Sequence, residues 1–139
     1  MIKVIILTVG KNKEQWLIEA IKVYEKRLQA KIQFEFVYLK DERKLAEEIK
    51  SKKPIILDAT GKQFTSEEFS SFFQRKIEES GSKVSFAIGG AYGFQNADLS
   101  NLVKISLSKM TLTHQMVRLL LVEQIYRAKL IQEGSAYHK

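Results

Sequence analysis

Short apolar runs alternate with amphipathic segments of helical period along nearly the whole chain, and no other feature of the sequence constrains the fold as strongly. Ile2–Val9 is an apolar run, and residues 13–31 after it repeat apolar side chains at helical spacing. Ile32–Leu39 alternates apolar with polar side chains, and the charged segment 41–52 carries apolar residues at i, i+4 spacing. The first half of the chain therefore predicts two strand-and-helix units.

The second half of the chain continues this alternation. Residues 54–58 and 84–88 predict two more strands, separated by a helix that the capping-box pair Thr65 and Glu68 opens and Gly81 ends. The pattern then predicts a short helix, a fifth strand and a long final helix, at residues 97–102, 103–107 and 115–131. Repeated alternation is typical of an α/β fold, here a mostly parallel sheet of five or six strands flanked by helices.

Length and residue usage limit the class of protein. The chain has 139 residues and no Gly/Ser-rich linker, so residues 1–139 are expected to form a single domain. The absence of cysteine excludes disulfides and thiolate sites, and two histidines without acidic neighbours at ligand spacing predict no metal site. No apolar stretch is long enough to span a membrane. We therefore expect a soluble, cytoplasmic protein.

Basic residues outnumber acidic ones. Lys and Arg number 23 against 16 Asp and Glu, which gives a formal net charge of +7 and a pI near 9.5. Such an excess attracts polyanions, RNA among them. Because positive charge does not identify a partner, a solvated basic surface explains this observation equally well.

The predicted final helix, residues 115–131, is apolar around most of its circumference. A helix of this kind is buried on two sides, and the sheet of so small a domain covers only one. We therefore expect a second copy of the chain to cover the other side in a homodimer, the alternative being a helix central to its own core. Arg118 and Arg127 on this helix are interpreted as surface ion-pair residues, with Glu123 at i, i+4 spacing from Arg127.

Three predicted strands end in segments that can approach a ligand. Ligands of open α/β sheets bind beyond the carboxyl ends of strands, which here are residues 57–62, 89–93 and 107–113. Gly89 and Gly90 allow close backbone approach, although a plain tight turn explains them as well. Gly10 stands alone after the first strand, so the chain lacks the glycine fingerprint of a dinucleotide-binding site. Gln63 replaces the Ser/Thr of a phosphate loop, so nucleotide hydrolysis is not expected.

Both histidines lie near segments of possible functional interest. His114 opens the final helix, where we interpret it as a packing or capping residue. His138 lies with Tyr137 and Lys139 in a polar tail, and a frayed chain end is the ordinary expectation there. Together, however, these three side chains offer stacking, hydrogen bonding and phosphate attraction, which proteins use to recognise single-stranded RNA.

Four segments of the sequence carry a resemblance to a known family. They read FAIGGAYG at 86–93, SLSKMTLTHQMVR at 106–118, VEQIYRA at 122–128 and YHK at 137–139. With them, and over nearly its whole length, the chain resembles the RlmH-type ribosomal RNA methyltransferases of the SPOUT class. The resemblance implies a SPOUT fold with a deep C-terminal trefoil knot, a topology that periodicity does not predict.

The resemblance also implies a cofactor, S-adenosylmethionine, held by the loops of the knot. Carried over by position, the residues of its pocket are Leu57, Gly89, Leu107, Ser108, Lys109, Met110, Thr111 and Leu112. These residues fall within the three strand ends selected above on physical grounds.

The family's substrate implies a role for the C-terminal tail. Its members methylate N3 of a pseudouridine in a hairpin loop of 23S ribosomal RNA within the ribosome, as homodimers that pack knot against knot. The tail of one subunit reaches the active site of the other, which assigns Tyr137, His138 and Lys139 to substrate binding. His138 is the expected catalytic residue, acting in proton handling or in orienting the base.

Three residues depart from the family pattern. Thr113, Ala91 and Ala136 stand where proline is frequent, or serine in the case of Ala91. None of them removes a contact atom of the implied site. Without proline at position 113 the loop is less restricted, so any consequence is expected in cofactor affinity.

Two other functions stay open at this point. A non-catalytic basic RNA-binding or ribosome-associated module explains the charge and the tail, but not the three strand ends. A flavodoxin-like nucleotide-binding protein requires a phosphate-binding turn after the first strand, which residues 9–12 supply poorly.

Overall fold

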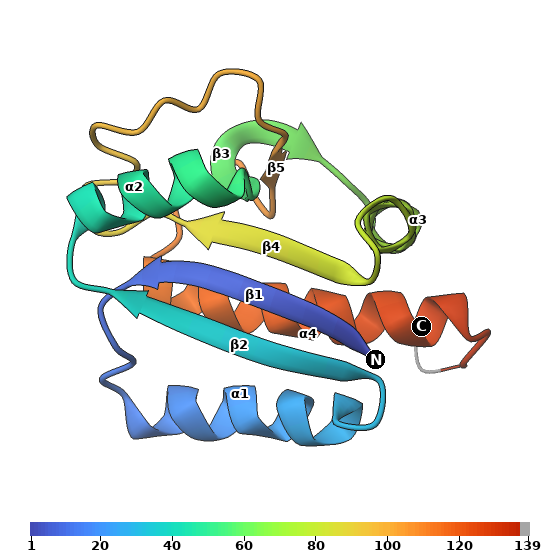
Figure 1. Cartoon of the computed structure of the whole chain (residues 1–139). Helices are drawn as coiled ribbons and strands as arrows, with labels where there is room; N and C mark the ends of the chain where they lie inside the picture. The colour runs from blue at the N-terminus through green and yellow to red at the C-terminus, as the bar shows by residue number, and fades with distance from the viewer. Residues whose placement is uncertain (137–139) are drawn as a thin grey trace.

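A five-stranded parallel sheet forms the centre of the molecule (Figure 1). The structure is a computed structural model that describes residues 1–136. The strand order is β2-β1-β4-β3-β5, and the strands are β1 Ile2–Val9, β2 Ile32–Leu39, β3 Ile55–Gln63, β4 Lys83–Ile88 and β5 Lys104–Ser106. Every neighbouring pair is parallel, which confirms the predicted α/β class.

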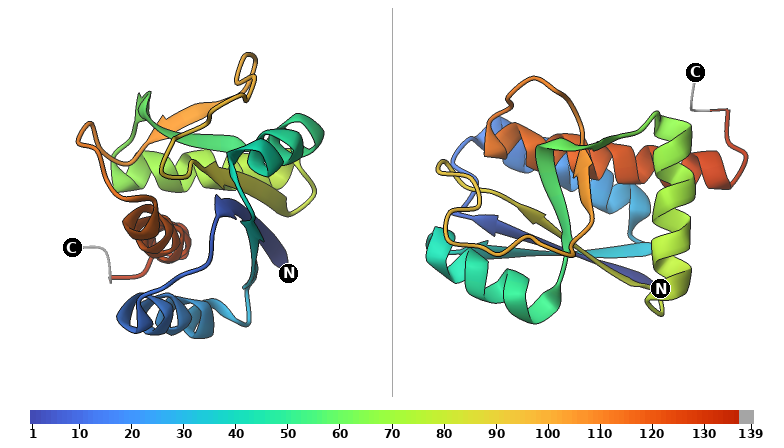
Figure 2. Two further views of the ribbon diagram at one scale, coloured as in Figure 1. Left: turned by 90° about the vertical axis from the view of Figure 1, so that its left-hand side faces the viewer. Right: turned by 90° about the horizontal axis from the view of Figure 1, so that it is seen from above.

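Helices cover both faces of the sheet (Figure 2). They are α1 Gln15–Leu28, α2 Glu42–Lys52, α3 Ser66–Glu79 and α4 His114–Gln132. The buried residues of α3 and α4 and the end of α1 join one apolar core with one sheet face, and α4 contacts both α1 and α3. The other face is covered by α2 and by the segment after β4. No helix within residues 1–136 is long and apolar enough to cross a membrane.

The central strand β1 is apolar throughout because both of its faces are covered. Val4 and Ile6 belong to the core beneath α1, α3 and α4, whereas Ile5 and Leu7 belong to the core beneath α2. All four are almost completely buried, and such burial contributes about 1.5–3 kcal/mol for each aliphatic side chain. The continuous apolar run seen in the sequence is therefore the pattern of a central parallel strand.

Strand β3 is longer than the sequence pattern predicts. It continues past residue 58 through a bulge, and Ile105 of β5 is opposite both Leu57 and Lys62. Gly61 makes this approach possible, because a Cβ added there would lie 2.7 Å from backbone atoms of Lys104 and Ile105. The short strand β5 is thus held by two parts of β3, which fixes where the following loop begins.

The predicted short helix at residues 97–102 is wrong. The segment forms turns instead, with left-handed backbone at Asn96 and Asn101 (φ 67° and 64°). Asp98 accepts hydrogen bonds from both the backbone N–H and the hydroxyl of Ser100, and such local bonds compete with a helix. The apolar residues of the segment pack against the core beneath α2, which explains their helix-like spacing.

The predicted capping box of α3 is confirmed. The backbone N–H of Glu68 donates to Thr65 Oγ1 at 3.1 Å, and the backbone N–H of Thr65 donates to Glu68 Oε1 at 2.8 Å. Farther along α3, the buried Ser70 hydroxyl donates to the carbonyl oxygen of Ala128 at 2.7 Å. This bond ties α3 to α4, whose first turn borders the cavity described next.

Candidate functional site

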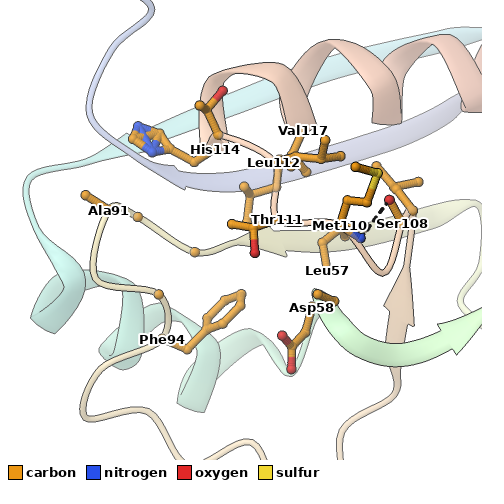
Figure 3. Close-up of a pocket in the computed structure, with 17 residues that line it drawn as sticks. Leu57, Asp58, Ala91, Phe94, Ser108, Met110, Thr111, Leu112, His114 and Val117 are labelled. Carbon is orange, nitrogen blue, oxygen red and sulfur yellow. Dashed lines mark hydrogen bonds between the residues drawn. The ribbon is translucent and has the colours of Figure 1, made fainter.

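A cavity of about 650 Å³ lies at the carboxyl edge of the sheet (Figure 3). Its wall comes from the end of β3, the loop after β4, the loop after β5 and the first turn of α4. The strands are parallel, so their carboxyl ends gather at one edge, and the three strand ends selected from the sequence meet here. The volume is in the range of small-molecule binding sites.

Seven of the eight residues predicted for the cofactor line this cavity. They are Leu57, Gly89, Leu107, Ser108, Met110, Thr111 and Leu112. The eighth, Lys109, is exposed and is not among the lining residues. Tyr137, His138 and Lys139, which were predicted to bind the substrate, lie outside the described residues.

Two serines hold the loop after β5 in place. The Ser106 hydroxyl accepts from the backbone N–H of Ser108 at 3.2 Å and donates to the carbonyl oxygen of the same residue at 2.8 Å. The Ser108 hydroxyl accepts from the backbone N–H of Met110 at 3.0 Å (Figure 3). The loop therefore presents a fixed backbone to the cavity, although the side chain of Met110 is largely exposed.

The glycine loop after β4 is both a tight turn and a wall of the cavity. The backbones of Gly90 and Gly93 exchange two hydrogen bonds, at 2.9 and 3.1 Å. A Cβ added at Gly89 would lie 3.0 Å from the backbone of Gly93, and one at Gly90 would lie 2.6 Å from the carboxylate of Glu42. That carboxylate also accepts the backbone N–H of Tyr92 at 3.1 Å, so α2 anchors the loop.

The first turn of α4 closes one side of the cavity. Thr113 caps the helix, with its hydroxyl oxygen accepting the backbone N–H of Met116 at 3.2 Å. The threonine that replaces a family proline thus contributes a helix cap. His114, which we had interpreted as a packing or capping residue, follows this cap and lines the cavity. Burial lowers the pKa of His114 most, and the nearby positive charge of Arg118 lowers it further, while the negative charge of Glu42 raises it.

The interpretation of Arg118 as a surface residue is wrong. Its side chain is fully buried, and all five of its N–H groups donate to neutral oxygens. The acceptors are Thr8 Oγ1 (2.9 Å), Asn12 Oδ1 (2.6 Å), Gln115 Oε1 (3.4 Å) and the carbonyl oxygens of Val9 (2.6 Å) and Gly10 (2.8 Å). By contrast, the predicted pair of Arg127 and Glu123 is confirmed, with an N–O distance of 2.8 Å.

Charged side chains are scarce in the cavity wall. Asp58 is the only acidic residue among the lining residues that the structure describes, and none of them is lysine or arginine. Most of the wall is apolar or backbone. Among residues 1–136, no three histidine, aspartate or glutamate side chains come together as a set that could hold a metal ion.

The comparison with known protein families covers nearly the entire chain. The family model described as "Predicted SPOUT methyltransferase" matches residues 2–138. The chain belongs to the SPOUT methyltransferase family. The resemblance that the sequence motifs indicated is therefore confirmed, and the cavity at the sheet edge is the candidate active site of a SPOUT methyltransferase.

Curated relatives resemble this SPOUT methyltransferase from end to end. Three of them share the name "Ribosomal RNA large subunit methyltransferase H". The protein of Protochlamydia amoebophila is 46% identical, with 100% of both chains covered. Those of Coprothermobacter proteolyticus and Streptococcus uberis are 41% and 40% identical, with 99% of each chain covered.

Sequence reasoning missed several residues of the site. Asp58 and Phe94 lie within or next to the selected strand ends, so a search of all side chains there would have found them. His114 and Val117 line the cavity only because α4 returns to the sheet edge. No sequence signal indicated that Arg118 is buried, since its partners in the turn after β1 are more than 100 residues away.

Proposed function

We propose that this SPOUT methyltransferase transfers a methyl group from S-adenosylmethionine to N3 of a pseudouridine in a hairpin loop of 23S ribosomal RNA. It acts on the ribosome, and therefore in the cytoplasm. The observation that carries the proposal is the cavity in which the loops after three parallel strands converge. The name shared by the relatives supports the class of substrate. The trefoil knot stays a prediction from the resemblance.

The cavity fits a sulfonium methyl donor in charge and in backbone shape. One carboxylate in a largely apolar wall favours a ligand that carries positive charge over an anionic nucleotide. Gly89 lines the cavity without a side chain, so its backbone can approach a ligand there. In this proposal Leu57, Gly89 and the loop 107–112 hold the donor, and Asp58 accepts a hydrogen bond from it. S-adenosylmethionine supplies an electrophilic methyl carbon when it is bound.

Methyl transfer to a ring nitrogen is an in-line displacement, so the first task of the chain is positioning. The serine-fixed loop after β5 and the glycine loop after β4 provide rigid walls for this purpose. The acceptor N3 must also lose a proton, which leaves negative charge on the flanking carbonyl oxygens. We assign proton handling or orientation of the base to His138, charge stabilisation or phosphate contact to Lys139, and base contact to Tyr137.

A homodimer completes the proposed site. Several apolar side chains of α4 stay partly exposed and belong to neither apolar core of the described chain: Met116, Leu119, Leu130 and Ile131. A second copy of α4 would cover them and bring the tail of one subunit to the cavity of the other. Light scattering should give the mass of a dimer, and Leu119→Glu should give an inactive monomer. A monomeric, active wild-type enzyme would refute this part of the proposal.

The net charge of +7 supports an RNA substrate but does not separate an enzyme from a non-catalytic RNA-binding module. Calorimetric titration with S-adenosylmethionine makes that distinction, because an enzyme has to bind the donor and a non-catalytic module does not. The central test is incubation of the enzyme with labelled donor and unmodified ribosomes, followed by mass spectrometry of the RNA. We expect one methyl group on a pseudouridine of 23S RNA, and donor binding without any labelled RNA would contradict the substrate.

The tail residues are tested in the same assay. His138→Ala should reduce turnover strongly while the calorimetric affinity for the donor stays near that of the wild type, because His138 is assigned to the acceptor and not to the donor. Unchanged methylation of ribosomes by this variant would rule out the role.

A further inference from the structure

The first turn of α4, which lines the cavity, continues into a buried arginine without a carboxylate partner in the described part of the chain. Arg118 is 0% exposed, and within the described residues no aspartate or glutamate forms an ion pair with it. Burial of a charge is costly unless a counter-charge or hydrogen bonds compensate for it, and here only neutral oxygens do so. The five hydrogen bonds satisfy the donors of the guanidinium group, but they supply no counter-charge for it.

The hydrogen bonds of Arg118 fix the geometry of one side of the cavity. They join the first turn of α4 to the carbonyl oxygens of Val9 and Gly10 at the end of β1, and to the side chains of Thr8 and Asn12. His114 and Val117 of the same turn line the cavity. The turn after β1, which serves poorly as a phosphate-binding loop, is thus occupied by the guanidinium group.

The titratable groups that act on Arg118 and on its neighbours lie on β2, α1 and α2. On β2, the ring centre of Tyr38 lies 5.7 Å from the guanidinium carbon, and burial raises the pKa of the phenol, so that it stays neutral. The negative charge of Glu25 on α1 also raises the pKa of Tyr38. The negative charge of Glu42 on α2 raises the pKa of His114, against the effect of Arg118. The Glu42 carboxylate also accepts a hydrogen bond from the backbone N–H of Tyr92.

The N-terminus of α4 adds to this positive field. The first backbone N–H groups of a helix carry partial positive charge, and within residues 1–136 the side-chain cap here is the neutral hydroxyl of Thr113. His114, the remaining titratable group of this turn, has a lowered pKa and is neutral at neutral pH. The positive charge on this side of the cavity therefore comes from Arg118 and the helix, and not from the histidine.

We propose that Arg118 is a positioning residue of the methyl transfer: its buried charge holds the first turn of α4 and favours the anionic form of the acceptor imide in the adjoining site. This inference rests on the proposed function. In the step itself the N3–H bond breaks and the proton passes to the solvent or to a base of the site. The electron pair left on N3 forms the bond to the methyl carbon, and the carbon–sulfur bond breaks with its pair going to sulfur.

The size of the expected effect follows from Coulomb's law. At an effective dielectric constant of about 20, a unit charge within roughly 10 Å changes an ionisation equilibrium by about tenfold. A fixed positive charge lowers the pKa of a neutral acid that ionises to an anion. Loss of the charge should therefore slow single-turnover methylation about tenfold where the imide is mostly protonated. The pH profile should move by about one unit to higher pH, and the difference should close at alkaline pH.

Three variants of Arg118 and one control variant test the proposal on the full chain with unmodified ribosomes. Arg118→Met and Arg118→Gln remove the charge, Arg118→Lys keeps it, and Arg127→Met removes a cation elsewhere on α4 as a control. We expect the shifted profile for the two neutral variants, and profiles with the wild-type midpoint for Arg118→Lys and Arg127→Met. A loss of methylation rate that is the same at every pH in the neutral variants, or a shifted pH profile in Arg118→Lys, would overturn the proposal. One of the two neutral variants suffices for this comparison, and a shifted midpoint in Arg118→Lys overturns the proposal whether or not they fold.

A measurement without RNA separates this inference from the proposed function. Because Arg118 lowers the pKa of His114, Arg118→Met or Arg118→Gln should raise that pKa in an NMR titration, and Arg118→Lys should leave it nearly unchanged. An unchanged His114 titration in the neutral variants means that the field does not reach the cavity wall, and the inference fails. A raised His114 pKa together with a wild-type enzyme that methylates no RNA would instead refute the proposed function.

Discussion

Replacement of Gly61 by alanine should separate strand β5 from strand β3 and disturb the cavity. The added Cβ would lie 2.7 Å from three backbone atoms of Lys104 and Ile105, whereas carbon atoms in contact prefer about 3.5–4.0 Å. One strand must therefore move by about 1 Å. Overpacking costs roughly 1–3 kcal/mol, and each weakened hydrogen bond between the strands costs about 1 kcal/mol more. We expect the free energy of unfolding to fall by about 2–4 kcal/mol.

Urea unfolding followed by circular dichroism measures this loss, and calorimetry measures the affinity for S-adenosylmethionine. The affinity should fall at least tenfold, because the loop that begins after β5 supplies most of the predicted donor contacts. Gly81→Ala is the matched control: its added Cβ meets no atom within 4 Å, so only the strain of its left-handed backbone remains, about 1 kcal/mol. The reasoning fails if Gly61→Ala is no less stable than Gly81→Ala and binds the donor normally.

Three further predictions concern the donor and the helix cap. Asp58→Asn should weaken binding of S-adenosylmethionine about tenfold in calorimetry, since it removes the one carboxylate among the described residues of the wall, whereas Asp98→Asn, outside the cavity, should not. Thr65→Ala should lower the free energy of unfolding in urea by about 1 kcal/mol through loss of the cap of α3, and an unchanged midpoint would contradict the capping role. Hydrogen bonds from the Thr65 backbone and then its side chain lower the pKa of Glu68. The contribution of the Glu68 carboxylate to stability should therefore be complete above the pKa of a free glutamate and lost as the pH falls through the pKa of Glu68 in the folded protein. Glu68→Gln should abolish this part of the pH dependence of the free energy of unfolding, measured in urea titrations.

Much of the fold is readable from local pattern. The continuous apolar run of β1 and the alternating run of β2 gave strands with the bounds that the structure has, because their burial is set by the period of the backbone. The cap of α3 was predicted because a capping box needs only residues close in sequence. Where local bonds compete, as at Asp98 and Ser100, helix-like spacing misled the prediction.

The candidate site was only partly predictable. The strand ends were identified because parallel strands place their carboxyl ends at one edge, and the family motifs indicated which residues there matter. Lys109 was grouped with its neighbours, and it is the one residue of that loop prediction that does not line the cavity, since spacing alone does not tell which side chains of a loop face a cavity. Asp58 and His114 were not selected, although both line the wall.

The α/β class, the family and the three strand ends that border the cavity could be read from the amino-acid sequence, because each of these depends on residues that are near one another in the chain. The three-dimensional arrangement was needed to show that Arg118 is buried at the end of β1, that Gly61 lies against β5 and that α4 closes the site. These features depend on contacts between residues far apart in sequence. Arg118 and Thr8 are separated by 110 positions, and no local pattern encodes which distant groups will satisfy a buried charge.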